Sequence, residues 1–339
     1  MRDIASCISE SSVIVSQSAA CTSYSNNGCI SPALVPSIRN AVTSLYRTTL
    51  SSQKQLLITV TWLRTSTGQT LIINFAGSGL DDPPAASFKL SLSSRLLRKK
   101  KGSKKVEPSS SNSTSRIEVF WDMSNVRFNA GPEPSDHFYV VVVVDSEIGL
   151  ILGDMKSHEA ALKKFNHEAS GGKFSMISRR ENYSGNTVYN TRASFSSGGP
   201  VHDILVHFVA DSMGIKPPAL LVYVDRKVAM RVKRLMWNFR GNQTMSIDGL
   251  LVDLMWDLHH WFFNPAGSGY AVFMFRTRSG LDRRLPLEEE KSSSSPEMEE
   301  ADHGADQFTL LIYAKVPRMT MYLEQWLFLL LINRKIEEQ

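Results

Sequence analysis

Cysteine is scarce in this chain of 339 residues, and its three copies (Cys7, Cys21 and Cys29) all lie near the amino terminus. An odd number of cysteines in one Ser-rich stretch provides no disulfide framework, so the sequence favours a reducing compartment. No Cys-x-x-Cys pair or Cys/His spacing typical of a zinc site is present. The apolar carboxyl-terminal end has an unbroken apolar run only from Trp326 to Ile332, which is too short to span a bilayer.

Familiar catalytic motifs are also missing. The sequence contains no HExxH, no nucleophile elbow, no phosphate-binding P-loop and no GxGxxG, and we predict neither a cofactor nor a metal. The most suggestive residues are Asp257, His259 and His260, which together with His202 and His207 could supply metal ligands, bind another ligand or supply a base. In an extended strand His259 and His260 would point to opposite faces and would not chelate together. The structural alternative, which we favour, is that Asp122 and Asp257 cap turns at the ends of equivalent strands.

A strong β pattern lies between residues 117 and 154. Apolar and polar residues alternate over 117–122, and residues 138–144 are apolar on both faces and mostly β-branched. Gly131-Pro-Glu-Pro separates these two stretches and predicts a loop, because proline lacks an amide proton and has a restricted φ. Residues 145–147 then predict a turn into a further strand at 148–152.

A similar pattern recurs about 135 residues later, which suggests an internal repeat. Residues 119–128 align with residues 254–263, and both stretches carry Trp-Asp at the same position. A loop rich in proline and glycine follows each stretch, and an apolar strand follows each loop. The alternative is a coincidence between two amphipathic strands.

Short strands and tight turns dominate the remainder of the chain. Asp225-Arg226 and Asp248-Gly249 predict two-residue hairpin turns, and Arg240 to Gln243 predicts a further turn. Helical spacing appears only at 36–47 and 156–167. We therefore predict a mainly β fold: antiparallel sheets in a sandwich or barrel-like arrangement, an internal duplication, and one or two short helices.

Composition divides the chain into four parts. We expect a disordered Ser-rich leader (1–36), a first β-rich half (37–195), a second β-rich half (196–315) and an apolar tail (316–339). The first half contains a basic loop at 95–115, and the second contains an acidic loop at 287–306.

The basic run accounts for much of the mild net charge of +5. It comprises Arg95, Arg98, Lys99, Lys100, Lys101, Lys104 and Lys105. Such a run is compatible with a solvated hairpin loop, a nuclear-import signal or an electrostatic patch for nucleic acid or anionic lipid. Because no aromatic residues that could stack on bases lie within it, we do not expect sequence-specific binding of nucleic acid.

Several segments together resemble a known family. They are residues 39–50, 57–62, 99–104, 131–134, 240–244 and 256–263. Their sequences are similar to a land-plant family of uncharacterised proteins, the domain of unknown function 868. The resemblance covers about residues 1–314 and implies a plant protein with a mostly β domain. It implies no activity, ligand or catalytic residue, and the tail after Lys315 departs from the family pattern.

The sequence has many strand and turn patterns but few candidate catalytic or ligand-binding residues. This favours a non-enzymatic protein-interaction module that holds partner proteins at its loops or at a sheet edge. One alternative is a peripheral domain that binds anionic membrane surfaces through the basic run. A further alternative is an enzyme or small-ligand binder that uses the region from Asp257 to His260. We expect a cytoplasmic protein, with nuclear entry through the basic run and organellar import as alternatives.

Overall fold

The chain is mainly β, as the sequence predicts. The computed structural model describes residues 36–77, 86–92, 100–107, 115–153, 172–209, 218–264, 268–278 and 307–317. Within these ranges the only helix is α2 (His259–Phe263). No helix in the described part of the chain is long and apolar enough to cross a membrane.

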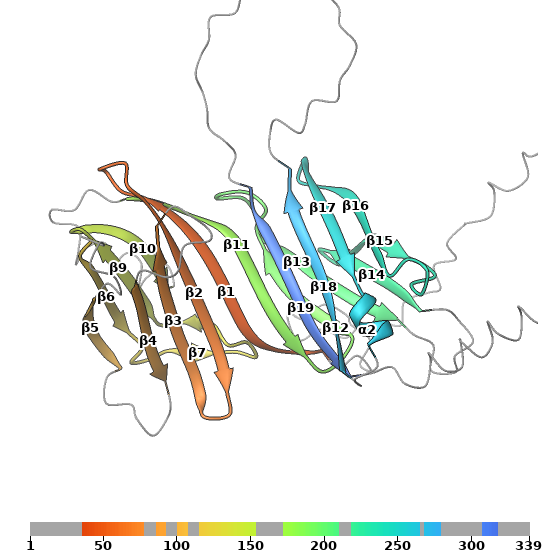
Figure 1. Cartoon of the computed structure of the whole chain (residues 1–339), viewed down its shortest axis with the longest axis horizontal. Helices are drawn as coiled ribbons and strands as arrows, with labels where there is room; N and C mark the ends of the chain where they lie inside the picture. Colours follow the sequence, from red (N-terminus) through yellow and green to blue (C-terminus); the bar gives the residue numbers. More distant parts are fainter. Residues whose placement is uncertain are drawn as a thin grey trace, which may run out of the picture. The chain divides into compact units, whose positions relative to one another are not determined.

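A nine-stranded sheet is the largest element (Figure 1). Its strands, in spatial order, are β16 (Arg240–Ile247), β17 (Leu250–Asp257), β18 (Ser268–Thr277), β19 (Thr309–Pro317), β11 (Lys173–Ser184), β1 (Ile38–Thr49), β2 (Gln55–Thr65), β3 (Gly68–Ala76) and β4 (Ala86–Leu92). Every neighbouring pair is antiparallel except β11 and β19, which run parallel. This parallel pair joins a strand from the middle of the chain to the last described strand.

Two four-stranded antiparallel sheets accompany it. One has the order β10 (Glu147–Gly153), β9 (Tyr139–Val144), β6 (Ile117–Asp122) and β5 (Lys101–Val106). The other has the order β12 (Val188–Ala193), β13 (His202–Val209), β14 (Ala219–Val224) and β15 (Lys227–Val232). A short hairpin joins β7 (Arg127–Phe128) to β8 (Pro134–Asp136). None of the sheets formed by the described strands closes into a barrel.

The buried apolar side chains fall into two main clusters. The first core joins β1–β4 to the sheet of β5, β6, β9 and β10, and includes Ile58, Ile73, Phe88, Val119 and Val142. The second core joins β11 and β16–β19 to the sheet of β12–β15, and includes Val206, Val222, Leu254, Phe273 and Ile312. Each small sheet therefore packs against a different part of the large sheet, and the burial of these side chains is the main stabilising contribution.

The two-residue hairpin turns are confirmed. Asp225-Arg226 joins β14 to β15, and Asp248-Gly249 joins β16 to β17. All four residues have positive φ, between 48° and 77°, as a type I′ turn requires. The predicted turn at 145–147 also forms, with positive φ at Asp145 and Ser146.

The helix predicted at 36–47 is wrong, because this segment forms β1. Its apolar residues Ile38, Val42 and Leu45 have a spacing compatible with a helix, but the segment is rich in β-branched residues. Pairing with β2 on one side and with β11 on the other satisfies its backbone groups and decides the conformation.

The turn predicted at Arg240 to Gln243 is also wrong, because these residues begin β16. Here glycine and asparagine occur within an edge strand, where Gly241 lies opposite Trp256. The leader (1–35), the helix predicted at 156–167, the acidic loop at 287–306 and the tail from residue 318 onwards lie outside the described residues.

Candidate functional site

The region from Asp257 to His260 forms the turn from β17 into α2. Asp257 ends β17, and its Oδ1 accepts a hydrogen bond from the backbone amide of His259 at 2.9 Å. Asp122 accepts in the same way from the amide of Ser124 at 3.0 Å. Both aspartates therefore have the turn-capping role that the sequence favours. His259 and His260 both lie in α2, so the geometry of an extended strand does not apply to them.

The two histidines of α2 make aromatic contacts. His259 is exposed, and its ring lies 5.6 Å from Phe239 and 5.1 Å from Phe263. His260 stacks on Tyr270 with ring centroids 3.8 Å apart.

His207 belongs to a different surface. It lies on β13, where Val206 and Phe208 point into the second core, so the alternation of the strand directs His207 to the opposite face. Burial lowers its pKa. Among the described residues no three His, Cys, Asp or Glu side chains gather closely enough to hold a metal ion.

The basic run is only partly described. Lys100 is exposed just before β5, and Lys101, Lys104 and Lys105 are exposed on β5 itself. These three lysines thus occupy an edge strand, whereas the sequence predicted a loop. Arg95, Arg98 and Lys99 lie outside the described residues.

Two hairpins share the same set of contacts. In the first, Lys101 pairs with Asp122 at 3.1 Å, and Gly102 lies opposite Trp121. In the second, Arg240 pairs with Asp257 at 3.0 Å, and Gly241 lies opposite Trp256. In each hairpin a tryptophan covers a glycine on an edge strand, an arrangement that protects the exposed glycine backbone. We call these the Trp-Asp hairpins.

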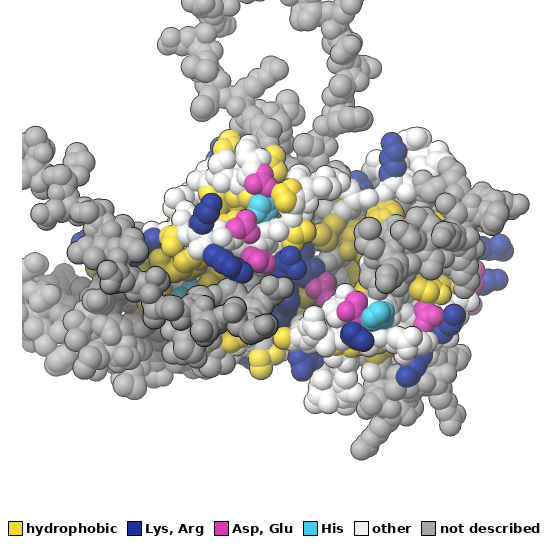
Figure 2. Space-filling model, turned by 180° about the vertical axis from the view of Figure 1, so that it is seen from behind, with side chains coloured by type: hydrophobic (Ala, Val, Ile, Leu, Met, Phe, Trp, Pro, Cys, Tyr) yellow, Lys and Arg dark blue, Asp and Glu magenta, His cyan; other side chains and the backbone are white. Residues whose placement is uncertain are grey.

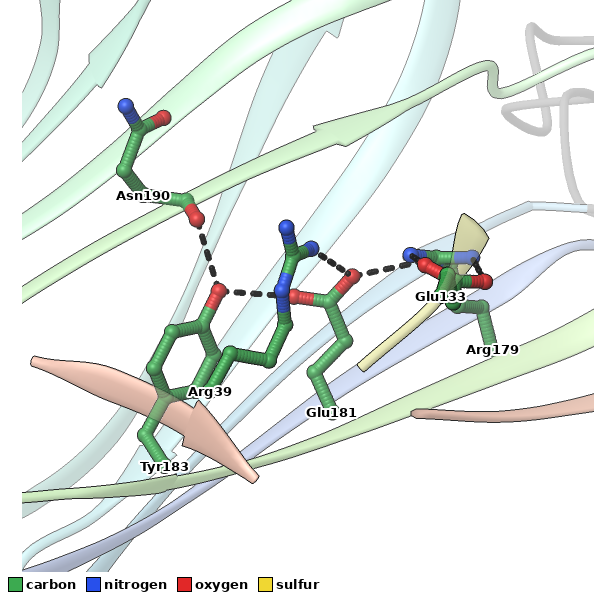
Figure 3. A network of polar contacts seen from close by, with 6 residues as sticks. All are labelled: Arg39, Glu133, Arg179, Glu181, Tyr183 and Asn190. Carbon is green, nitrogen blue, oxygen red and sulfur yellow. Dashed lines mark hydrogen bonds and ion pairs between the residues drawn. The ribbon is translucent and has the colours of Figure 1, made fainter. Parts of the chain in front are cut away.

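A buried ionic network lies on β11, in the middle of the large sheet (Figure 3). Glu181 is fully buried, and its Oε1 accepts hydrogen bonds from Arg39 on β1 at 3.0 Å and from Arg179 at 2.7 Å. Arg179 also donates from its two terminal nitrogens to the carboxylate of Glu133, at 2.9 and 2.5 Å. Since Glu133 belongs to the predicted Gly131-Pro-Glu-Pro loop, the network holds that loop against the centre of the sheet.

The network continues into the second core through Tyr183. Its hydroxyl lies 2.7 Å from Oε2 of Glu181 and 2.6 Å from the backbone carbonyl oxygen of Asn190 on β12 (Figure 3). The single hydroxyl proton can be donated to only one of these acceptors at a time. Tyr183 thus connects the ionic network to the sheet of β12–β15.

Glu181 and Arg179 keep their charges at neutral pH. Burial would raise the pKa of Glu181, but the charges of Arg179 and Arg39 outweigh it and lower this pKa. Burial would lower the pKa of Arg179, but Glu133 and Glu181 raise it above its ordinary value. Burial, together with the charge of Glu181, raises the pKa of Tyr183. All three shifts are away from neutrality, so the network is suited to structural cohesion rather than to proton transfer near pH 7.

This network was not predicted from the sequence. A signal was present: Arg179-Arg180-Glu181 places three consecutive charged residues in the interior of an otherwise well-patterned strand. Alternation directs Arg179, Glu181 and Tyr183 to one face of β11.

A cationic segment lies within the second half of the chain. This cationic edge, residues 226–240, comprises the end of the β14–β15 turn, β15 and the connection to β16. It contains no Asp or Glu and six exposed cations: Arg226, Lys227, Arg231, Lys233, Arg234 and Arg240. Arg240 pairs with Asp257, and none of the other five forms an ion pair with a described residue. On the face seen in Figure 2, Lys and Arg side chains are mixed with Asp and Glu side chains.

Apolar side chains are exposed on the same edge. Trp237, in the connection between β15 and β16, is 71% exposed, and Val228 on β15 is 58% exposed. β15 and β16 are each the last strand of their sheet, so no described strand pairs with their outer sides. The cationic edge therefore combines positive charge, an exposed aromatic ring and two strand edges.

The sequence matches one family model over residues 37–315, that of plant proteins of unknown function, DUF868. The chain belongs to this family. No curated protein and no solved structure matches the chain. Within this DUF868 chain the match ends at residue 315, which agrees with the departure of the tail from the family pattern, but it begins at residue 37. The leader therefore lies outside the matched region, contrary to the wider resemblance inferred from sequence.

One further cluster of this family member links its hairpin turns. His202 is 8% exposed, and its Nδ1 lies 2.7 Å from Asp225 while its Nε2 lies 3.0 Å from Asp248. The two aspartates lie in the β14–β15 and β16–β17 turns, so His202 connects the sheets on either side of the second core. Burial would lower the pKa of His202, but the hydrogen bonds and charges of the two aspartates raise it.

Replacing His202 by glutamine should destabilise the protein by about 1–2 kcal/mol at pH 5.5, allowing for the half-exposed aspartates. Because the folded-state pKa is raised, the contribution of His202 is complete below its unfolded pKa of about 6.5 and is lost as the pH rises through the folded value. Urea unfolding of both proteins at pH 5.5 and pH 9 would test this. A difference in stability that stays the same at the two pH values would contradict it.

Proposed function

We propose that this chain is a non-enzymatic protein-interaction module that binds an extended, acidic segment of a partner protein along the cationic edge and β16. The observation that carries the proposal is the charge of the cationic edge: residues 226–240 contain six exposed cations and no Asp or Glu, and only Arg240 is paired, beside an exposed tryptophan. The absence of catalytic motifs from the sequence agrees with a binding role.

Charge complementarity supports an acidic partner. Five of the six cations form no ion pair with a described residue, so a partner carboxylate would not have to displace an existing bond. Exposed pairs of this kind contribute little individually, but a complementary surface raises the association rate and selects against cationic partners. Trp237 adds apolar area of the type that anchors protein interfaces.

Strand addition supports an extended partner. β16 is an eight-residue edge strand without proline, and Arg240 is its only charged residue. Edge strands that bind no partner are usually shortened, bulged or protected by charge. A peptide that pairs with β16 would satisfy its outer backbone groups, while neighbouring cations on β15 and in the 233–240 connection meet acidic side chains.

A direct test uses a labelled ten-residue peptide with glutamate and threonine at alternate positions, measured by fluorescence anisotropy at low salt. The wild-type chain should bind it, and 0.5 M NaCl should weaken binding. The variant Arg231→Glu/Lys233→Glu/Arg234→Glu should bind at least about tenfold more weakly, because three attractions become repulsions. The same peptide with N-methyl groups on alternate amides should also bind more weakly, because it cannot donate hydrogen bonds to a strand edge.

The matched control is Lys101→Glu/Lys104→Glu/Lys105→Glu, which makes the same change of charge on β5. Binding that is unaffected by this control places the contact on the cationic edge. Equal losses in both triple variants, or no loss in either, would refute the assignment. If the chain ignores the peptide but sediments with vesicles of 30% phosphatidylserine, the membrane alternative would replace the protein-interaction proposal.

We further propose that the chain arose by internal duplication, with β1–β10 and β12–β19 as the two repeats, each packing four strands of the large sheet against one four-stranded sheet. The element order supports this: β1–β4 precede β5, β6, β9 and β10, and β12–β15 precede β16–β19. The Trp-Asp hairpins occupy the same place in both halves. Superposing β5, β6 and β9 on β16, β17 and β18 should bring Trp121 onto Trp256, and a failure to do so would contradict the duplication.

A further inference from the structure

A cavity of about 240 Å³ lies beside the first core, distant in sequence from the cationic edge. It is partly open to solvent, and its wall is made by Ser44, Tyr46, Val60, Trp62, Glu133, Pro134, Phe138, Leu152 and Gly153. Residues of β1 and β2, the β7–β8 hairpin and the end of β10 thus meet around one space. Because none of these residues belongs to the cationic edge, an inference about the cavity is independent of the proposed protein partner.

The strand register directs the side chains of β1 toward this space. Ser44 lies opposite Val60, and Tyr46 lies opposite Ile58. Opposed residues of an antiparallel pair point to the same face, and Ile58 and Val60 belong to the first core. Ser44 and Tyr46 therefore contribute hydroxyl groups to this wall.

Aromatic rings define the shape of the cavity. Trp62 and Phe138 meet edge to face, with ring centroids 6.1 Å apart and an angle of 87° between the planes. This contact fixes two rings of the wall, and Tyr46 adds a third. Flat aromatic walls favour a planar ligand.

The loop side of the cavity is held firmly in place. Glu133 is bound by Arg179 through two hydrogen bonds, and the backbone carbonyl of Ala130 accepts a hydrogen bond from Arg64 at 2.9 Å. The bidentate pair neutralises the carboxylate of Glu133, so the cavity does not require a cationic ligand. The wall is thus pre-formed, which reduces the entropic cost of binding.

The volume of the cavity limits the size of the ligand. An engineered apolar cavity of about 150 Å³ in another protein holds benzene. A volume of 240 Å³ therefore suits a molecule of one or two rings. Burial raises the pKa of Tyr46, so its hydroxyl keeps its proton at neutral pH and can donate a hydrogen bond to a ligand.

We propose that this cavity binds a neutral, planar molecule of one or two rings that carries a hydrogen-bond acceptor such as a carbonyl oxygen. The rings lie against Tyr46, Trp62 and Phe138, and the acceptor faces the hydroxyl groups of Tyr46 and Ser44. The Gly131-Pro-Glu-Pro segment serves as one wall of the site.

Two probes of similar size test the proposal. Coumarin has two fused rings and a carbonyl acceptor, whereas indole has two fused rings and no carbonyl. Ligand-observed NMR titrations should show coumarin binding more tightly than indole to the full chain. Tyr46→Phe should weaken coumarin binding about two- to twelvefold, the range expected for one hydrogen bond of 0.5–1.5 kcal/mol, and should leave indole unchanged.

Leu152→Phe provides the blocking variant, because the larger side chain fills the cavity at a half-buried position. It should abolish binding of both probes. The matched control is Leu90→Phe, which enlarges another half-buried residue that packs against the first core but does not line the cavity. This control should bind both probes like the wild type.

Circular dichroism should show that all three variants are folded before the titrations are compared. The proposal is overturned if neither probe binds the wild type, or if Leu152→Phe binds both as well as Leu90→Phe does. Equal losses of coumarin and indole in Tyr46→Phe would also overturn it, since the hydroxyl would then play no part. Acidic-peptide binding does not depend on any of these three positions, so failure here leaves the proposed function intact.

Discussion

Replacing Glu181 by alanine should lower the free energy of unfolding by about 3–5 kcal/mol, the cost of breaking a buried ion pair by removing one partner. Glu181 is fully buried between Arg39 and Arg179. Without it Arg39 loses the carboxylate it pairs with, while Arg179 keeps only Glu133. The hydroxyl of Tyr183 also loses Oε2 of Glu181 as a hydrogen-bond acceptor.

Urea unfolding at pH 7, followed by circular dichroism, would measure the effect. Asp203→Ala is a suitable control, because it breaks an exposed pair with Arg192 and should change stability by no more than about 0.5 kcal/mol. A loss below about 1 kcal/mol for Glu181→Ala would show that water or a rearranged side chain readily replaces the carboxylate.

The effect should also depend on pH. Because the pKa of Glu181 is lowered in the folded protein, its contribution is complete above the unfolded value of about 4.3 and is lost as the pH falls through the folded value. The difference between wild type and Glu181→Ala should therefore be constant from pH 6 to 8 and narrow in acid. A difference that instead narrows with rising pH would contradict the assigned direction.

Gly241→Ala should destabilise the chain by about 1–3 kcal/mol, the typical cost of overpacking. A Cβ atom at this position would lie 2.3 Å from Cζ2 of Trp256. The indole cannot simply move away, because its Nε1 donates to the backbone carbonyl of Asn238 at 2.9 Å and Trp256 is largely buried. Either this hydrogen bond must break or the pairing of β16 with β17 must be distorted.

The equivalent change in the other Trp-Asp hairpin is an internal comparison. Gly102→Ala would place its Cβ atom 3.0 Å from Cζ2 of Trp121, so we expect a smaller loss of stability. Urea unfolding should rank Gly241→Ala as the more damaging. In a Trp256→Leu background the cost of Gly241→Ala should decrease, since the side chain that it meets is gone. A cost that does not change in that background would show that the tryptophan is not its source.

Local sequence signals were sufficient to predict features that depend only on residues adjacent in sequence. The turns at Asp225-Arg226 and Asp248-Gly249 form as predicted, because the backbone conformation of a two-residue turn is set mainly by those two residues. The capping roles of Asp122 and Asp257 were also accessible, since each aspartate bonds to an amide only two positions further on.

Prediction failed where pairing with a segment distant in sequence decides the backbone conformation. Ile38 and Val42 fit a helical stripe as well as a strand, and only pairing with β2 and β11 makes the segment a strand. Arg240 and Gly241 resemble a turn in isolation, but Trp256 on the neighbouring strand covers the glycine and permits an edge strand.

The sequence alone determined that this is a mainly β chain, where most of its strands lie, and which family it resembles. Only the tertiary structure decided that β11 and β19 pair in parallel, and that β15 and β16 end their sheets. It also brought Glu133 to Arg179, 46 positions further along the chain, where Arg179 binds Glu181 as well. The physical reason is that strand alternation and turn geometry are local, whereas sheet order, buried ion pairs and cavities depend on which distant segments meet.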